Sequence, residues 1–97
     1  MTEVLFRPEV ADDLAAAWEW YEQQKPGLGD ALLDVVERCV EGIADNPKVF
    51  AIVHREVRRA LIGRFPFAVF FVVQPKEITI IAVLHVRRDP GVWRSRA

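Results

Sequence analysis

The chain has 97 residues, of which 52% are hydrophobic and 28% are charged, and its formal net charge at pH 7 is −1. This length suits a single domain spanning residues 1–97, and no apolar run approaches the roughly 18 residues that a membrane span requires. The single cysteine, Cys39, excludes an internal disulfide, and the N-terminus lacks the basic and then apolar order of a secretory signal. We therefore expect a cytoplasmic protein with no membrane partner.

The charges are distributed unevenly along the chain. Residues 1–53 carry eleven acidic and four basic side chains, whereas residues 54–97 carry three acidic and nine basic ones. Two interpretations are open. Either the basic half meets a polyanionic or acidic partner, or the two halves neutralise each other within one fold.

The N-terminal half predicts one short strand and two helices. A β-prone run at residues 4–6 precedes Pro8, which can begin a helix because its ring fixes a helical φ. Apolar residues recur at steps of three and four up to about residue 24, where Lys25-Pro26-Gly27 ends the helix. A second helical face runs over residues 28–44 and ends at Asp45-Asn46-Pro47. The short break between them favours an antiparallel helical hairpin.

The C-terminal half predicts three strands, over residues 57–62, 67–73 and 78–86, followed by a short basic tail. The order β-α-α-β-β-β indicates an α+β fold, with the helical hairpin packed on one face of a small antiparallel sheet. In the last strand the even-numbered positions are all apolar and should face the helices. The odd-numbered positions, which include His85, should line the open face.

The middle strand, residues 67–73, is apolar on both faces. The helical hairpin can cover only one of these faces. We favour a partner on the other face, either a segment of another protein or a second copy of this chain. The alternative is that the tail and the loop at 47–56 fold across it.

No residues carry the spacing of a metal motif or a glycine-rich phosphate loop, so no metal ion or cofactor is expected. Ser95 is the only serine, which argues against a serine hydrolase. What is left is a group of arginines beside His85 and Trp93. Planar guanidinium groups suit the recognition of phosphate or carboxylate.

Five segments stand in a recognisable order and spacing: Pro26-Gly27-Leu28-Gly29, Asn46-Pro47, Val57-Arg58-Arg59-Ala60-Leu61, Arg64-Phe65-Pro66-Phe67, and the run from His85 to Trp93. Together they resemble the RelE/ParE toxins of type II toxin–antitoxin modules, over essentially the whole chain. The resemblance implies the same β-α-α-β-β-β fold and a cognate antitoxin, with which the toxin forms a hetero-oligomer. It also implies one of two targets. RelE-like members cut messenger RNA on the ribosome, and ParE-like members poison DNA gyrase.

Two departures from the RelE-like pattern favour the ParE-like interpretation. Phe67 is followed by Ala68, where RelE-like ribonucleases commonly carry a basic residue. Trp93 stands where they commonly carry a tyrosine for proton transfer, and an indole N–H cannot act as a base. We therefore expect a gyrase-binding toxin without catalytic residues. The alternatives are a RelE-like endoribonuclease that uses His85, Arg64 and Arg87, and a degenerate member that only binds its antitoxin.

The resemblance and the arginine group together give two sets of expected contact residues. The residues expected to bind the target are Arg59, Arg64, His85, Arg87, Arg88 and Trp93. The residues expected to bind the antitoxin are Arg58, Phe67, Phe70, Phe71 and Trp18.

Overall fold

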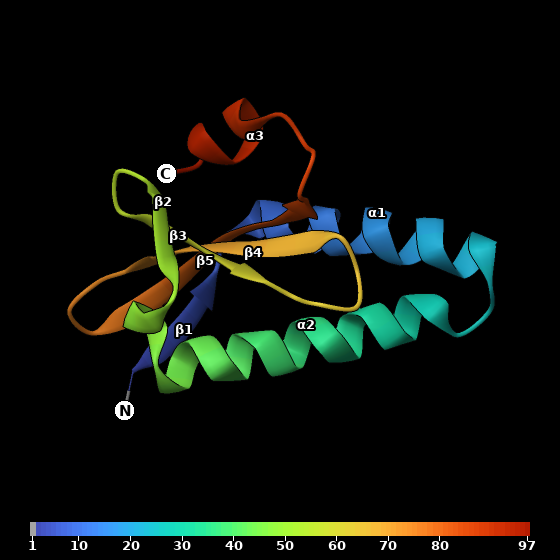
Figure 1. Cartoon of the computed structure of the whole chain (residues 1–97), viewed down its shortest axis with the longest axis horizontal. Coiled ribbons are helices and arrows are strands. Elements are labelled where there is room, and N and C mark those ends of the chain that lie inside the picture. Colours follow the sequence, from blue (N-terminus) through green and yellow to red (C-terminus); the bar gives the residue numbers. More distant parts are fainter. Residues whose placement is uncertain (1) are drawn as a thin grey trace.

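The computed structural model describes residues 2–97, which form three α-helices, one 3-10 turn and five strands (Figure 1). In chain order these are β1 (Glu3–Phe6), α1 (Pro8–Gln24), α2 (Leu28–Asp45), the turn η1 (Pro47–Val49), β2 (Ala51–His54), β3 (Val57–Leu61), β4 (Phe67–Val73), β5 (Glu77–His85) and α3 (Pro90–Arg94). The strands make one sheet in the order β1-β5-β4-β3-β2. The α+β prediction and the helical hairpin are confirmed. Strand β2 lies in the segment 47–56, where the sequence pattern predicted a loop.

The sheet is mixed, not wholly antiparallel as the sequence pattern predicted. Strands β2 to β5 pair antiparallel with their neighbours, but β1 runs parallel to β5. Strand β1 reaches the sheet from the far end of the sequence, so no hairpin turn sets its direction. The alternation of apolar residues therefore carried no information about this pairing.

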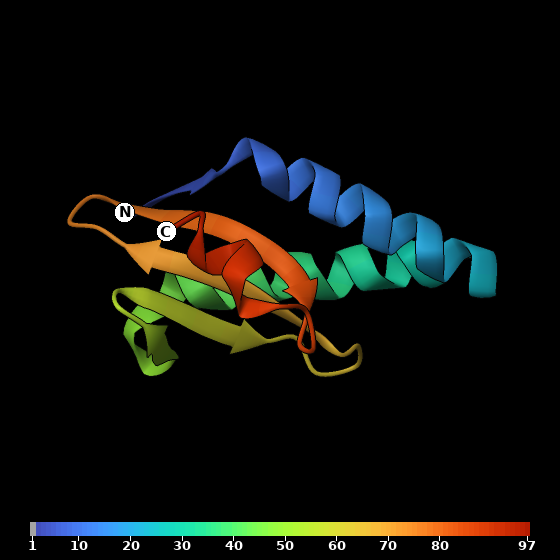
Figure 2. The same cartoon turned by 90° about the horizontal axis from the view of Figure 1, so that it is seen from above.

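Helices α1 and α2 form the antiparallel hairpin seen in Figure 2. Their close approach depends on one glycine, Gly29. A Cβ atom at Gly29 would lie 2.7 Å from the Cδ1 atom and from the backbone oxygen of Trp18. The Glu22 carboxylate accepts hydrogen bonds from the backbone N–H groups of Gly27 and Gly29, at 2.9 and 2.8 Å. It thereby satisfies N–H groups at the start of α2 that have no partner within the helix.

The face of the sheet that the hairpin covers is called here the helix face. It packs against Leu32, Val36 and Ile43 of α2, which are all buried. The core on the helix face also contains the side chains of Val69 and Phe71 of β4, at alternate positions, as the sequence pattern predicted.

On the described part of the chain no helix is long and apolar enough to cross a bilayer.

A β-bulge changes the orientation of side chains in β5. Phe70 pairs with Ala82 while Phe71 pairs with Ile80, so Ile81 is an extra residue in β5. Because one extra residue reverses the alternation, Ala82 and Leu84 point away from the helices. The expectation that these even-numbered positions face the helices is wrong after Ile80.

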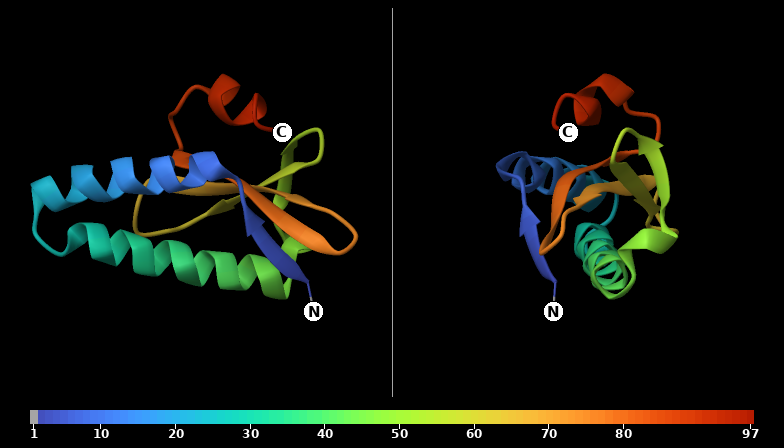
Figure 3. Two further views of the ribbon diagram at one scale, coloured as in Figure 1. Left: turned by 180° about the vertical axis from the view of Figure 1, so that it is seen from behind. Right: turned by 90° about the vertical axis from the view of Figure 1, so that its left-hand side faces the viewer.

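The opposite face, called here the tail face, is covered by α3 (Figure 3). Trp93 is 6% exposed and its ring stacks on Phe70, with centroids 4.5 Å apart and planes 15° from parallel. Around this stack lies a second core of buried residues, namely Val57, Ala68, Ile81, Ala82 and Leu84. The expectation of a partner on an uncovered sheet face is therefore wrong, because the C-terminal tail supplies the cover.

The tail is fixed by an ion pair between its end and the first helix. The Arg96 guanidinium donates to both carboxylate oxygens of Asp13, at 2.7 and 3.1 Å, and also to the carbonyl oxygen of Ile81 at 3.1 Å. Asp13 also accepts a hydrogen bond from the backbone N–H of Val83 at 3.0 Å. Both backbone groups belong to the bulged part of β5, beyond the end of β1. The pair therefore joins α1, β5 and the tail.

Candidate functional site

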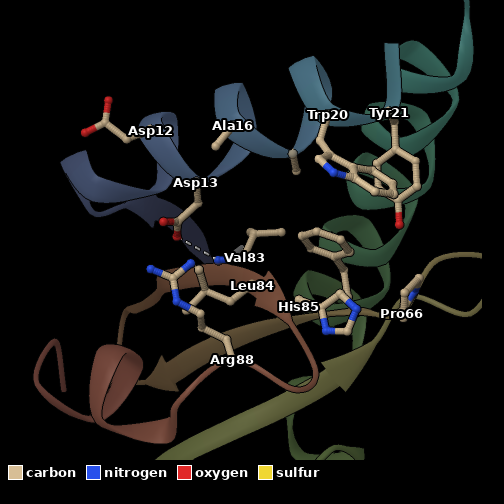
Figure 4. Close-up of a pocket in the computed structure, with 12 residues that line it drawn as sticks. Asp12, Asp13, Ala16, Trp20, Tyr21, Pro66, Val83, Leu84, His85 and Arg88 are labelled. Carbon is tan, nitrogen blue, oxygen red and sulfur yellow. Dashed lines mark hydrogen bonds between the residues drawn. The ribbon is translucent and has the colours of Figure 1, made fainter. Parts of the chain in front are cut away.

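A cleft of about 570 Å³ lies between α1 and the end of the sheet where β5 stops and β4 begins (Figure 4). Small side chains of α1 leave the space open, and aromatic rings form much of the wall. The lining residues are Asp12, Asp13, Ala16, Ala17, Trp20, Tyr21, Pro66, Phe67, Val83, Leu84, His85 and Arg88. The walls are mainly apolar, with polar groups at the two ends.

His85 lies in this cleft because the bulge at Ile81 turns it toward the helix face. Its ring contacts Phe67 edge-on, with centroids 5.5 Å apart. Its Nδ1 atom accepts a hydrogen bond from the backbone N–H of Arg87 at 3.0 Å, so in the neutral ring the proton is on Nε2. The expectation that His85 lines the open face is therefore wrong, because the bulge reverses the alternation of side chains after Ile80.

Few polar groups in the cleft are free to react. Burial raises the pKa of Tyr21 above its ordinary value of 10.0, so its hydroxyl keeps its proton at neutral pH. Asp13 is engaged by Arg96 and by the N–H of Val83. In Figure 4 the Arg88 side chain extends along the cleft in the direction of Asp13. This arrangement suits the binding of an apolar side chain from a partner better than proton transfer.

The three residues expected for an endoribonuclease do not share this cleft. His85 lines it, but Arg64 and Arg87 do not. The guanidinium of Arg64 lies over the ring of Phe65, 5.4 Å from its centroid. Arg64 and Arg87 are both exposed, on turns that leave the same end of the sheet, where β4 begins and β5 ends.

A cluster of positive charge lies on the tail face, around the Trp93–Phe70 stack. Arg59 is the cross-strand partner of Phe70 in β3, and Arg94 lies over the Trp93 ring, 5.3 Å from its centroid. His54 contacts the same ring edge-on at 6.0 Å. We call the set His54, Arg55, Arg59, Trp93 and Arg94 the basic tail surface.

The hairpin offers a second surface on its outer side. An apolar groove there is lined by Ala11, Leu14, Ala15, Trp18, Glu19 and Leu33. Trp18 is 37% exposed, and its indole N–H donates to the Asp30 carboxylate at 2.9 Å, so the ring is held in one position. We call this set the hairpin groove.

The other residues expected to bind an antitoxin have different positions. Phe70 and Phe71 are buried on opposite faces of the sheet and present no surface to a partner in this fold. Phe67 is partly buried and lines the cleft. Arg58 donates to the carbonyl oxygens of Lys48 and Phe50, at 3.3 and 2.8 Å, and so holds η1 against the sheet.

Trp93 also differs from its expected role, because its burial makes it a core residue that supports the arginines around it. Arg88 lines the cleft, whereas Arg59, which belongs to the same expected target-binding set, lies on the tail face. The expected target-binding set does not contain His54, Arg55 or Arg94, although Asp89-Pro90-Gly91 at the start of α3 is a sequence signal for a helix N-terminus. Among residues 2–97, no three histidine, cysteine or acidic side chains are placed to hold a metal ion.

Comparisons with known proteins agree with the fold. A family model described as "ParE toxin of type II toxin-antitoxin system, parDE" matches residues 4–90. A solved structure titled "Chromosomal ParDE TA system from P. aeruginosa" superposes with a TM-score of 0.78 at 22% sequence identity. The alignment covers 88% of this chain and 96% of that one. A search of curated proteins found no match.

Proposed function

Because the chain belongs to the ParE toxin family of type II toxin–antitoxin systems, we propose that it inhibits growth by binding DNA gyrase and that a cognate antitoxin neutralises it. The family match over residues 4–90 is the observation that carries this proposal. The site geometry supports a binding protein, because the walls of the cleft are mainly apolar and Arg64 and Arg87 lie outside it.

The same geometry argues against messenger cleavage. Cleavage of RNA at the 2′-hydroxyl requires a base, an acid and positive charge near the reacting phosphate. The Nδ1 atom of His85 is occupied by a backbone N–H, and neither Arg64 nor Arg87 reaches the cleft in which His85 lies. Trp93 is buried, so it cannot supply the proton transfer of a tail tyrosine.

The hairpin groove is the part of the expected antitoxin surface that offers apolar contacts. Trp18, Leu14 and Leu33 line it, and the two alanines on α1 make room for side chains of a second helix. Helices α1 and α2 carry ten acidic residues and one basic residue, Arg38, so an antitoxin segment seated here needs an apolar stripe with basic flanks.

Acidic side chains of the antitoxin would in turn meet exposed arginines, namely Arg59 on β3 and Arg64 and Arg87 on the turns at the end of the sheet. Such contacts would mask the arginines that bind the target, which accounts physically for neutralisation. Exposed charge pairs are worth about 0–1 kcal/mol each, so apolar contacts should dominate affinity. The complex should therefore persist in about 1 M NaCl, where screening is nearly complete. Dissociation at that salt concentration would contradict this account.

The proposal is tested by expressing the chain alone and together with the antitoxin encoded beside it. Growth should stop in the first case and continue in the second. Transcripts are followed in the same cells, because intact messengers during the arrest separate a gyrase toxin from a ribonuclease. Normal growth when the chain is expressed alone would instead indicate a degenerate member that only binds its antitoxin. Messenger cleavage that is lost in His85→Ala would identify the RelE-like alternative.

A further inference from the structure

The molecule is electrically polar across its sheet. The hairpin, residues 8–45, carries the ten acidic residues noted above. Segments 51–61 and 87–97 together carry seven arginines and two acidic residues, Glu56 and Asp89. Helix α3 and helix α2 lie on opposite sides of the sheet (Figures 1 and 3), so the two charges face in different directions.

Two of these seven arginines already have partners inside the fold. Arg96 is paired with Asp13, and Arg58 donates to two backbone carbonyl groups. On the part of the chain that the structure describes, Arg55, Arg59 and Arg94 make no ion pair and are exposed. The basic tail surface therefore presents charge that the fold itself does not use.

Two of these three arginines, Arg59 and Arg94, stand directly on the packed core. Arg59 stands beside Phe70 on a central part of the sheet, and Arg94 lies over Trp93, which stacks on Phe70. The pKa of His54 is lowered from its ordinary value of 6.5, first by burial and then by the charges of Arg94 and Arg55. Those two guanidinium groups therefore act on the same point of the surface.

Arg55 occupies its position at a conformational disadvantage. It lies in the tight turn between β2 and β3 with a φ of 52°, in the left-handed region where glycine is the favoured residue. A side chain there costs about 1–2 kcal/mol relative to an ordinary conformation. We interpret an arginine at this strained position as a residue that is kept for the charge of its side chain.

We propose that the basic tail surface binds the phosphate backbone of duplex DNA. All its full charges are arginines, whose planar forks match phosphate oxygens and which order easily on a rigid support. The large aromatic rings of this surface are buried, so they offer little to the apolar centre that a protein partner requires. The helix at this surface, α3, has only five residues and packs Trp93 into the core, so we expect contact to phosphates without reading of sequence.

This inference goes beyond the proposed function, because it concerns DNA alone and holds whether or not gyrase is the target. A bound gyrase would bring the surface against DNA at high local concentration, so weak intrinsic binding suffices. The test accordingly uses the intact chain and DNA without gyrase, and its result is separate from that of the growth experiment.

The experiment measures fluorescence anisotropy of a short labelled duplex between about 50 and 200 mM NaCl. Three phosphate contacts predict a slope of log K against log salt of about −2.7. The double variant Arg59→Ala/Arg94→Ala should lose about tenfold in affinity and reduce the slope to about −0.9. The double lysine variant at the same positions keeps the charge and should retain most of the slope. Circular dichroism checks that each variant is folded.

The matched control is Arg38→Ala on the exposed side of α2, which should leave DNA binding unchanged. A second arm replaces the duplex with polyglutamate, as a model of an acidic protein surface. Binding of polyglutamate as tight as that of DNA would overturn the proposal in favour of a protein partner. The absence of DNA binding at the lowest salt, or equal loss in Arg38→Ala, would also overturn it.

Discussion

Asp13 and Arg96 lie 83 positions apart and form a two-pronged ion pair that fastens the C-terminal tail to the first helix. Their side chains are 7% and 14% exposed, so the pair is largely shielded from water. Hydrogen bonding to Asp13 raises the pKa of Arg96 further above its already high ordinary value. The pair also provides partners for two backbone groups of β5, the N–H of Val83 and the carbonyl of Ile81, which lie beyond the end of β1.

Removing one partner of this pair should destabilise the fold. Arg96→Ala leaves the Asp13 carboxylate shielded without its cation, at a cost of about 3 kcal/mol. Urea unfolding measures this loss as a shift of the midpoint. Arg94→Ala, two positions earlier and exposed, is the control and should change stability by less than about 0.5 kcal/mol. Equal midpoints for Arg96→Ala and the native chain would show that the pair does not hold the tail.

The cover of the tail face depends on one aromatic stack. Trp93→Ala removes the ring that lies on Phe70 and opens the second core, at a cost of about 3–5 kcal/mol. Trp93→Phe keeps part of the contact and should cost less. Thermal unfolding of both variants gives the comparison. If Trp93→Ala unfolds at the temperature of the native chain, the tail does not form part of the core.

Two glycines of α2 should respond in opposite ways to alanine. At Gly29 a methyl group would meet Trp18 at 2.7 Å, so Gly29→Ala must separate the helices and should cost about 1–3 kcal/mol. At Gly42 nothing lies within 4 Å, so Gly42→Ala should stabilise the helix by about 0.5–1 kcal/mol. The same denaturation assay serves both. Similar effects of the two substitutions would contradict the close packing of α1 on α2.

The environment of His54 predicts a pH effect with a definite sign. Its pKa is lowered in the folded chain, so below pH 6.5 the unfolded chain binds a proton there more readily than the folded chain does. Its contribution to stability is therefore complete above that pH and decreases as the pH falls below it. An NMR titration should find the pKa below 6.5, and Arg94→Ala should move it upward. A value at or above 6.5 in the native chain would contradict the convergence of charge on the tail face.

The left-handed turn predicts a separation of stability from binding. Arg55→Gly relieves the strain at φ 52° and should stabilise the chain by about 0.5–1 kcal/mol, while its affinity for duplex DNA falls. Arg59→Gly, in the extended backbone of β3, should instead lower stability by roughly 1 kcal/mol. Loss of stability in Arg55→Gly would remove the argument that this arginine is kept for its charge.

Local patterns were sufficient to predict most of the elements. The bounds of β4 and the start of α2 follow from runs of apolar residues and from Pro and Gly beside them. Strand β2 was missed because its four residues follow η1 without a turn signal of their own. The parallel pairing of β1 with β5 joins segments far apart in the sequence, so the local periodicity of apolar residues does not predict it.

The site was less predictable, and one residue explains much of the difference. Ile81 adds a bulge to β5, which moves His85 to the helix face and Leu84 to the tail face. An apolar residue at 81 looks the same in the sequence whether or not it is bulged. Similarly, Trp93 reads as an exposed tail aromatic until the position of Phe70 gives it a stacking partner. The arginines form one group in the sequence, but the structure divides them: Arg59 and Arg94 lie on the tail face, Arg88 lines the cleft, and Arg58 and Arg96 have partners inside the fold.

The central claim, that this ParE-family toxin acts on gyrase, is tested most directly by a supercoiling assay with the pure chain, pure gyrase and relaxed plasmid. The account predicts that supercoiling stops and that gyrase stays trapped on cleaved DNA, and that both effects disappear when the cognate antitoxin is added first. Supercoiling at the normal rate in a large excess of folded toxin would contradict it.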